Sequence, residues 1–408
     1  MSIAQADPPA RSGVARVVWA SFALASVVFH IGLVFSGLVP NLVSRPVHLI
    51  FVLPWVLVHG QAGLSLITGA VLAVLGVGAA AWVALSHDAL SDQYGFLEGP
   101  GQVAIAAVLI GVVLEAARRA IGWPLPLVAA AALAYGLWGQ HIPGRFGHSG
   151  TPLESFLGTL TIAEGGLWGS LAAVSVNVVA IFVIFGAVLN AGEAGQGFMN
   201  VAAAAAGRLR GGAAKVSVLS SALFGSISGS ASANVASTGA ITLPAMDRLG
   251  YPKRIAGAVE AVASSGGQIM PPLMGAGAFV MVELTGTPYT AIMAAAALPA
   301  LLYFWAVWVG IDGYARRFEL RGLAPEDRPR LRDVAVTSGF FLVPFTVLLW
   351  GMFGLDVTPQ YAACLAIFAG CALLLTGADL RMDLRRAAER AETALLTAGR
   401  QVALIGSI

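Results

Sequence analysis

Side chains with neutral oxygens are concentrated in one uncharged stretch, Ser217 to Pro244. The stretch holds eight serines, two threonines and one asparagine among apolar residues, and it contains no ionisable side chain. Polar groups of this kind inside an apolar chain are typical of segments that line a site within a membrane protein. Serine stands at every second position from 226 to 232. An extended backbone there would place four hydroxyl groups on one side.

A second irregularity follows at Ser264 to Pro272, where two glycines and two prolines interrupt an apolar segment. Pro271 and Pro272 bring no N–H group, so carbonyls in the preceding turn lose their helical partners. Irregular backbone at membrane depth is tolerated only where protein buries it or where it lines a cavity. A polar hairpin tip that faces a broken helix is how ion-coupled transporters build a site near the membrane midplane.

The charges around the serine-rich stretch indicate how the chain folds back. Lys215 precedes the stretch, and Asp247 with a basic cluster at 248–254 follows it. Basic residues mark the cytoplasmic side of a membrane protein, so both ends belong on that side. Only 31 residues separate Lys215 from Asp247, whereas two regular helical crossings need about 40 residues. We therefore predict a re-entrant hairpin over residues 217–245.

The rest of the chain has the composition of a membrane protein. Of its 408 residues, 58% are hydrophobic and 11% are charged, which indicates a polytopic α-helical protein embedded in a lipid bilayer. The expected spans cover residues 17–39, 47–85 (a short and a full span), 102–117, 124–139, 168–189, 255–282 (the broken crossing), 289–311, 334–353 and 359–375. With the N-terminus inside, every basic cluster except Arg45 and Arg145 falls on the cytoplasmic face.

Isolated polar residues in these spans have two interpretations each. We expect His30 to hydrogen-bond to a neighbouring helix and Glu260 to cap or brace the broken helix. Proton transfer is the alternative for both, because ionisable groups inside a membrane are often functional. We interpret Cys364 and Cys371 as small core residues and not as a disulfide or a pair of metal ligands.

Several motifs resemble those of a known transporter family. The motifs are Gly225 to Ser230, Ala233-Asn234, Leu243-Pro244, Ala256 to Ala261 and Gly266 to Pro272. They are similar to motifs in the membrane component of tripartite ATP-independent periplasmic (TRAP) transporters, in the TAXI branch, where the small and large membrane subunits are fused. The resemblance is specific over about residues 150–310 and rests on hydropathy alone before residue 145.

The resemblance implies a fold and a domain organisation. The fold class is an all-α polytopic membrane protein with a re-entrant hairpin and a broken helix, the first half of an inverted-repeat transporter. Residues 1–145 would correspond to the small subunit with its linking helix, and residues 146–380 to the first half of the large subunit. By the same resemblance, residues 381–408 would begin the second half and leave it incomplete, and the sequence stops in the middle of an apolar run. A chain truncated there is expected to insert into a membrane but not to transport.

The resemblance also implies a function. Such proteins import an organic acid or similar carboxylate across the bacterial or archaeal cytoplasmic (inner) membrane, driven by an ion gradient, usually sodium. A periplasmic substrate-binding protein delivers the substrate. Sodium as the coupling ion is the only cofactor expected, and neither enzymatic activity nor a nucleic-acid partner is expected.

The same resemblance assigns site residues. Sodium would be held by side-chain oxygens of Ser228, Ser230 and Asn234 and by carbonyl oxygens of Gly266, Ile269 and Pro271. Ser226, Ser232 and Asn234 would face the substrate. No lysine or arginine lies between Val216 and Met246, so any cation that pairs with the substrate carboxylate would come from the second half.

Two other classes of protein fit parts of the pattern. A stand-alone anion transporter uses similar hairpins without a binding protein. An intramembrane serine hydrolase is suggested by Gly225 to Gly229, which approaches a G-x-S-x-G motif, but Ile227 stands in the place of the nucleophile. A nucleophilic serine also needs a positioned base, and no histidine follows His148. The substrate, the choice between sodium and proton coupling, and the oligomeric state remain open at this point.

Overall fold

The structure is a computed structural model that describes residues 13–407. Residues 1–12, from the predicted small-subunit domain (1–145), and residue 408, from the predicted start of the second half (381–408), lie outside the described residues. The described residues form α-helices with short 3-10 and π turns and no β-strand. Six segments are long and apolar enough to cross a membrane, and two shorter apolar helices accompany them. The predicted all-α polytopic fold is confirmed.

The described chain divides into two compact units. Unit 1 comprises residues 13–180 with 396–407, and unit 2 comprises residues 181–395. The predicted boundaries at residues 145 and 380 are those between parts that would correspond to transporter subunits. The packing of this chain does not test that correspondence, so these boundaries stay predictions.

Unit 1 is a bundle of apolar helices. Its helices are α1 (Gly13–Ser36), α2 (Asn41–Leu57), α3 (Gly63–Leu85), α4 (His87–Ser91), α5 (Gly99–Ile121), α6 (Pro124–Trp138), α7 (Leu153–Thr161) and α8 (Ser170–Val174), followed by a π turn at Ser175–Val179. Buried His30 on α1 bonds through Nε2 to Nδ1 of His48 on α2 at 2.8 Å. His48 Nε2 in turn lies 3.1 Å from the Ser175 hydroxyl. His30 therefore does hydrogen-bond to a neighbouring helix.

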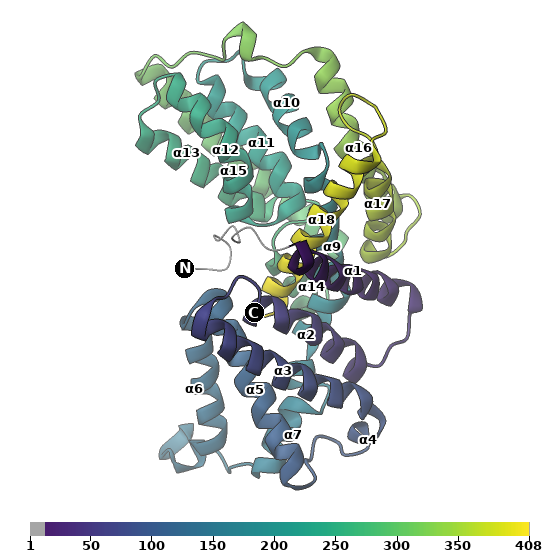
Figure 1. Cartoon of the computed structure of the whole chain (residues 1–408). Coiled ribbons are helices and arrows are strands. Elements are labelled where there is room, and N and C mark those ends of the chain that lie inside the picture. The colour runs from purple at the N-terminus through teal and green to yellow at the C-terminus, as the bar shows by residue number, and fades with distance from the viewer. Residues whose placement is uncertain (1–12, 408) are drawn as a thin grey trace. The chain divides into compact units, whose positions relative to one another are not determined.

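Unit 2 contains the serine-rich stretch and the broken crossing. Its helices are α9 (Ala180–Ala191), α10 (Ala194–Ala206), α11 (Gly212–Ser228), α12 (Ala231–Arg248), α13 (Lys253–Gly266), α14 (Ala276–Thr285), α15 (Tyr289–Arg317), α16 (Leu331–Phe353), α17 (Pro359–Leu374) and the first part of α18 (Leu384–Gly406). Helices α11, α12, α13 and α15 lie side by side (Figure 1). Their apolar core includes Met246, Ala263, Phe304 and Ile311.

The predicted hairpin is two helices joined by a two-residue turn. Helix α11 has 17 residues and α12 has 18, so each arm is about 26 Å long at 1.5 Å per residue. That length is somewhat below the hydrocarbon thickness of about 30 Å. The arms pack against each other and both contact α13.

The extended backbone predicted for residues 226–232 is wrong. Helix α11 continues through Ser228 and α12 begins at Ala231, so only Gly229 and Ser230 are non-helical. Ser226 and Ser228 are therefore about 200° apart around a helix and do not align on one side. The physical reason is that a helix satisfies its own backbone groups in apolar surroundings, whereas an isolated extended segment leaves them unpaired.

The broken crossing is confirmed as an interruption between two helices. Helix α13 ends at Gly266, a 3-10 turn covers Gly267–Ile269, and α14 starts only at Ala276. The peptide bond between Pro271 and Pro272 is cis, and Met274 has φ +54°. Six residues between the 3-10 turn and α14 thus run outside any helix.

The hairpin predicts that both of its ends are exposed on the cytoplasmic side. Arg208 is exposed shortly before α11, Arg248 is exposed at the end of α12, and Glu283 is exposed near the end of α14. With Cys364 and Cys371 replaced by alanine, single cysteines at 208 and 248 should react with an impermeant thiol reagent only from the cytoplasm. A cysteine at 283 should react only from the other side. Labelling of positions 208 and 248 from opposite sides would contradict the hairpin.

Candidate functional site

The turn of the hairpin depends on a glycine at position 229. Gly229 has φ +57°, in the left-handed region that glycine adopts without steric cost, and its N–H bonds to the Gly225 carbonyl at 3.1 Å. A Cβ atom at this position would lie 1.9 Å from the Met274 carbonyl oxygen. The turn therefore lies directly against the segment that follows the break in the α13–α14 crossing.

Two further contacts join the hairpin to the break. The Leu273 N–H donates to the Ser226 carbonyl at 3.2 Å. A Cβ on Gly225 would lie 2.1 Å from Gly267 Cα, so the backbones of α11 and the 3-10 turn touch at this point. The structure thus brings the predicted hairpin tip and the predicted break together.

The four predicted serines have different surroundings. The buried Ser226 hydroxyl donates to the Leu223 carbonyl at 2.6 Å. Ser228 and Ser230 form a loose turn, with the Ser230 N–H 3.4 Å from the Ser228 hydroxyl. Ser230 is the N-cap of α12, and Ser232 is exposed with its hydroxyl 3.2 Å from that of Ser230. Three hydroxyls therefore gather at the tip, while Ser226 is directed back into its own helix.

Carbonyl groups at the break are only partly used. Pro272 offers no N–H, the Leu273 N–H goes to Ser226, and the Met274 N–H bonds to the Met270 carbonyl. Among the loop hydrogen bonds of the described chain, the carbonyls of Ile269 and Pro271 accept none. Gly266 and Gly267 are buried at the end of α13. Two of the three carbonyls expected to hold sodium are thus free of backbone partners.

Asn234 connects the hairpin with α13. Its side chain is fully buried, and Nδ2 donates to the Ser221 carbonyl at 2.9 Å and to the Ser264 carbonyl at 3.4 Å. Because both partners of Nδ2 are acceptors, the amide orientation is fixed and Oδ1 points elsewhere. Oδ1 is buried and has no hydrogen-bond partner among the described residues. A buried acceptor without a donor is costly unless a ligand satisfies it.

Glu260 is more central than the sequence analysis expected. It is 1% exposed and accepts hydrogen bonds from hydroxyl groups on three helices, α11, α12 and α13. The donors are Ser217, Thr238, Thr242 and Ser264. The expectation that Glu260 braces the broken helix agrees with these contacts. The sequence analysis missed the four hydroxyl partners, although the four-residue spacing of the polar residues on these helices indicates them.

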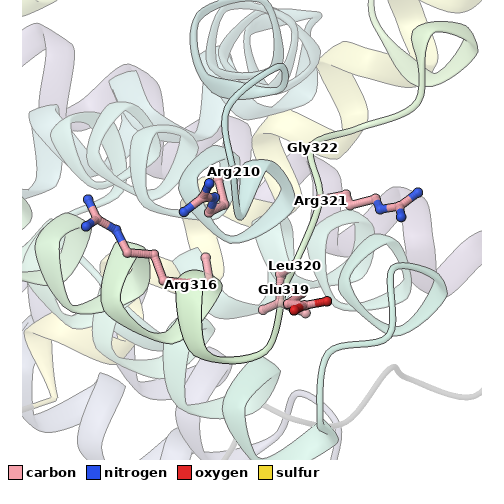
Figure 2. A pocket seen from close by; sticks show the side chains of 7 residues that line it. Arg210, Arg316, Glu319, Leu320, Arg321 and Gly322 are labelled. Atoms are coloured by element: carbon pink, nitrogen blue, oxygen red, sulfur yellow. The ribbon is translucent and has the colours of Figure 1, made fainter.

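A separate cavity lies where the loop after α15 meets the turn before α11. It is lined by Arg210, Ala315, Arg316, Glu319, Leu320, Arg321 and Gly322. Figure 2 shows the side chains of Arg316 and Arg321 extending away from each other, with Glu319 between them. Because these charges do not converge, the cavity offers no focused anion site. The hairpin tip is the better candidate for binding.

The fold and the tip define a class: a helical membrane protein with a polar hairpin packed against a broken helix. The family described as "Tripartite ATP-independent periplasmic transporter, DctM component" matches residues 108–408, well over half of the chain. The chain therefore belongs to this family of transporters and is a multi-pass protein of the inner membrane.

Individual relatives agree with the family. The chain is 28% identical over 281 residues to an isethionate TRAP transporter permease protein DctMQ of Oleidesulfovibrio alaskensis, covering 62% of this chain and 43% of that protein. It is 28% identical over 209 residues to a C4-dicarboxylate TRAP transporter large permease protein DctM of Pseudomonas aeruginosa, covering 50% and 47%. It is also 29% identical over 194 residues to an uncharacterised Salmonella typhimurium protein, YgiK, covering 47% and 44%. The matches span less than half the length of each of these relatives.

The contact between Gly225 and Gly267 predicts a strong effect of one methyl group. Gly225→Ala should destabilise the chain by about 1–3 kcal/mol, because its Cβ cannot fit against the Gly267 backbone. Gly257→Ala on α13 is the matched control, since a Cβ there meets nothing within 4 Å. It should leave the stability unchanged or raise it by about 0.5–1 kcal/mol. Thermal unfolding in detergent measures both, and equal melting temperatures for the two variants would disprove the close contact.

Proposed function

We propose that this chain acts in a TRAP transporter that imports an organic acid or similar carboxylate, driven by a sodium gradient. Family membership supports transport as the activity. The names of two relatives refer to organic anions, isethionate and C4-dicarboxylates. In this proposal a periplasmic substrate-binding protein delivers the substrate. The chain belongs to the TAXI branch, with residues 1–145 as a fused small subunit.

The observation that carries the sodium proposal is the unpartnered Oδ1 of Asn234. A small hard cation needs oxygen ligands, and Asn234 offers a buried oxygen that no protein donor uses. The proposed ligand set adds the hydroxyls of Ser228 and Ser230 and the carbonyls of Gly266, Ile269 and Pro271. The C-terminal end of α13 contributes further, because the end of a helix carries partial negative charge.

The proposed substrate contacts lie around the same turn. Helix α12 begins at the tip, and its N-terminal N–H groups carry partial positive charge that favours a carboxylate. Ser232 is exposed in the first turn of α12, the Asn234 side chain in the same turn is buried, and Ser226 precedes the turn. Discontinuous helices with N-termini directed at an anionic substrate are the usual arrangement in transporters of this kind.

The sodium site can be tested by uptake. In the transporter that contains this chain, Asn234→Ala and Ser230→Ala should each raise the sodium concentration for half-maximal uptake by about tenfold, equal to about 1.4 kcal/mol. Ser237→Ala, an exposed hydroxyl on the same helix, should change it little. Uptake of labelled organic acids into proteoliposomes measures the dependence on sodium. The same assay with and without the periplasmic binding protein measures the dependence on that protein. Wild-type uptake that is indifferent to sodium would refute sodium coupling.

A further inference from the structure

A tyrosine of the next helix holds the break in the α13–α14 crossing. Tyr289 is the first residue of α15 and is 6% exposed. Its hydroxyl donates to the Pro272 carbonyl and lies 3.0 Å from the Leu273 carbonyl oxygen. Both carbonyls belong to the segment between the 3-10 turn and α14, which runs outside any helix. Helix α15 thus supplies a donor to carbonyls that have no helical partner.

The peptide unit between Pro272 and Leu273 is fixed from both sides. Its carbonyl accepts the hydrogen bond from Tyr289 on α15, and its N–H donates to the Ser226 carbonyl on α11 at 3.2 Å. Because a peptide unit is planar, these two hydrogen bonds orient the whole plane between the two helices. The hairpin, the break and α15 therefore meet at one peptide unit.

This fixed plane restricts the carbonyl that precedes it. Two backbone dihedrals relate adjacent peptide planes, and the ring of Pro272 locks one of them, φ, at about −65°. The Pro271 carbonyl can therefore turn relative to the fixed plane through ψ of Pro272 alone. Within residues 13–407 no loop hydrogen bond reaches the Pro271 carbonyl, which is one of the proposed sodium ligands.

Aromatic packing restrains Tyr289 itself. Its ring stacks on that of Phe279 on α14, with ring centroids 4.7 Å apart and an angle of 7° between the planes. The ring of Phe182 on α9 lies 5.1 Å from that of Phe279 and 5.7 Å from that of Tyr289. A side chain locked by packing holds its polar group in one place. The hydroxyl of Tyr289 is therefore a fixed donor.

We propose that Tyr289 is a positioning residue for the sodium site: it fixes the peptide unit after Pro272 and thereby holds the Pro271 carbonyl in the orientation that binds the ion. Tyr289 acts through the backbone and is not itself a ligand. The inference rests on the proposed sodium site, to which it adds a residue from outside the hairpin and the broken helix.

A tyrosine with a purely structural role would behave differently. If Tyr289 only satisfied buried carbonyls, loss of its hydroxyl would lower stability equally in sodium and in choline. If it positions a ligand, the same loss also weakens sodium binding, because the Pro271 carbonyl is no longer held in place. An ion that binds the folded state raises the melting temperature according to its affinity, so the sodium-dependent part of the stability separates the two roles.

Tyr289→Phe tests the proposal, because it removes the hydroxyl group and keeps the ring. In the transporter that contains this chain, the sodium concentration for half-maximal uptake should rise about tenfold, as is typical when a partner that orients a metal ligand is lost. The rise in melting temperature from choline to sodium should shrink as well. Tyr303→Phe is the matched control, since this hydroxyl on the same helix donates to the Val262 carbonyl within α13 at 2.7 Å. It should leave both sodium readouts unchanged.

A second variant covers the case in which Tyr289→Phe does not fold. 4-Aminophenylalanine incorporated at position 289 keeps the ring and an N–H donor that is weaker than the phenol. Its sodium concentration for half-maximal uptake should lie above that of the wild type and below that of Tyr289→Phe.

The outcomes separate the two claims. A wild type that responds to sodium, together with unchanged sodium readouts in Tyr289→Phe or in the 4-aminophenylalanine variant, would overturn the positioning role and leave the sodium site in place. A wild type that sodium neither stabilises nor activates would overturn the sodium site and the positioning role with it.

Discussion

The packing of unit 2 depends on how polar groups are satisfied where no water is available. Inside a membrane every buried donor and acceptor must find its partner within the protein. Glu260 on α13 finds its hydrogen-bond partners on three helices, because it accepts hydrogen bonds from hydroxyl groups of α11, α12 and α13 itself. Removing any one helix would leave a buried carboxyl group short of donors. The hairpin and the broken helix therefore share one buried set of hydrogen bonds.

Glycine allows the same three elements to come close. At Gly225 and Gly267 the backbones touch, and at Gly229 the turn lies against the Met274 carbonyl. These contacts leave no space for side chains, and the polar atoms close by are those of Asn234, the neighbouring serines and the carbonyls of Ile269 and Pro271. Close packing around a buried, unpaired amide oxygen agrees with the proposed cation site, because a site holds its ligands best on well-packed elements.

Much of this arrangement could be predicted from the sequence. The charge pattern and the length between Lys215 and Asp247 were enough to predict the hairpin, and Pro271 with Pro272 predicted the break. The alternating serines suggested an extended backbone, because alternation is typical of a strand. The structure instead has helices up to the turn, since a helix pairs its own backbone groups. Only a glycine able to adopt a positive φ made so short a turn possible.

The role of Glu260 could have been found from spacing. Ser217 and Ser221, Asn234 with Thr238 and Thr242, and Glu260 with Ser264 are each four residues apart. Such pairs lie on one face of a helix, so three helices with polar stripes indicate a shared polar seam. What the sequence could not give is which stripes face one another. That depends on the close approach of α11 to the break.

The central claim is that the hairpin tip and the break hold a cation at Asn234 Oδ1. A high-resolution structure of the chain in lipid nanodiscs, determined once in sodium and once in choline, tests it most directly. The account predicts density beside Asn234 Oδ1, within coordination distance of the Ile269 or Pro271 carbonyl, in sodium and not in choline. The same density in both salts, or an Asn234 amide whose Oδ1 accepts a hydrogen bond from the protein, would contradict it.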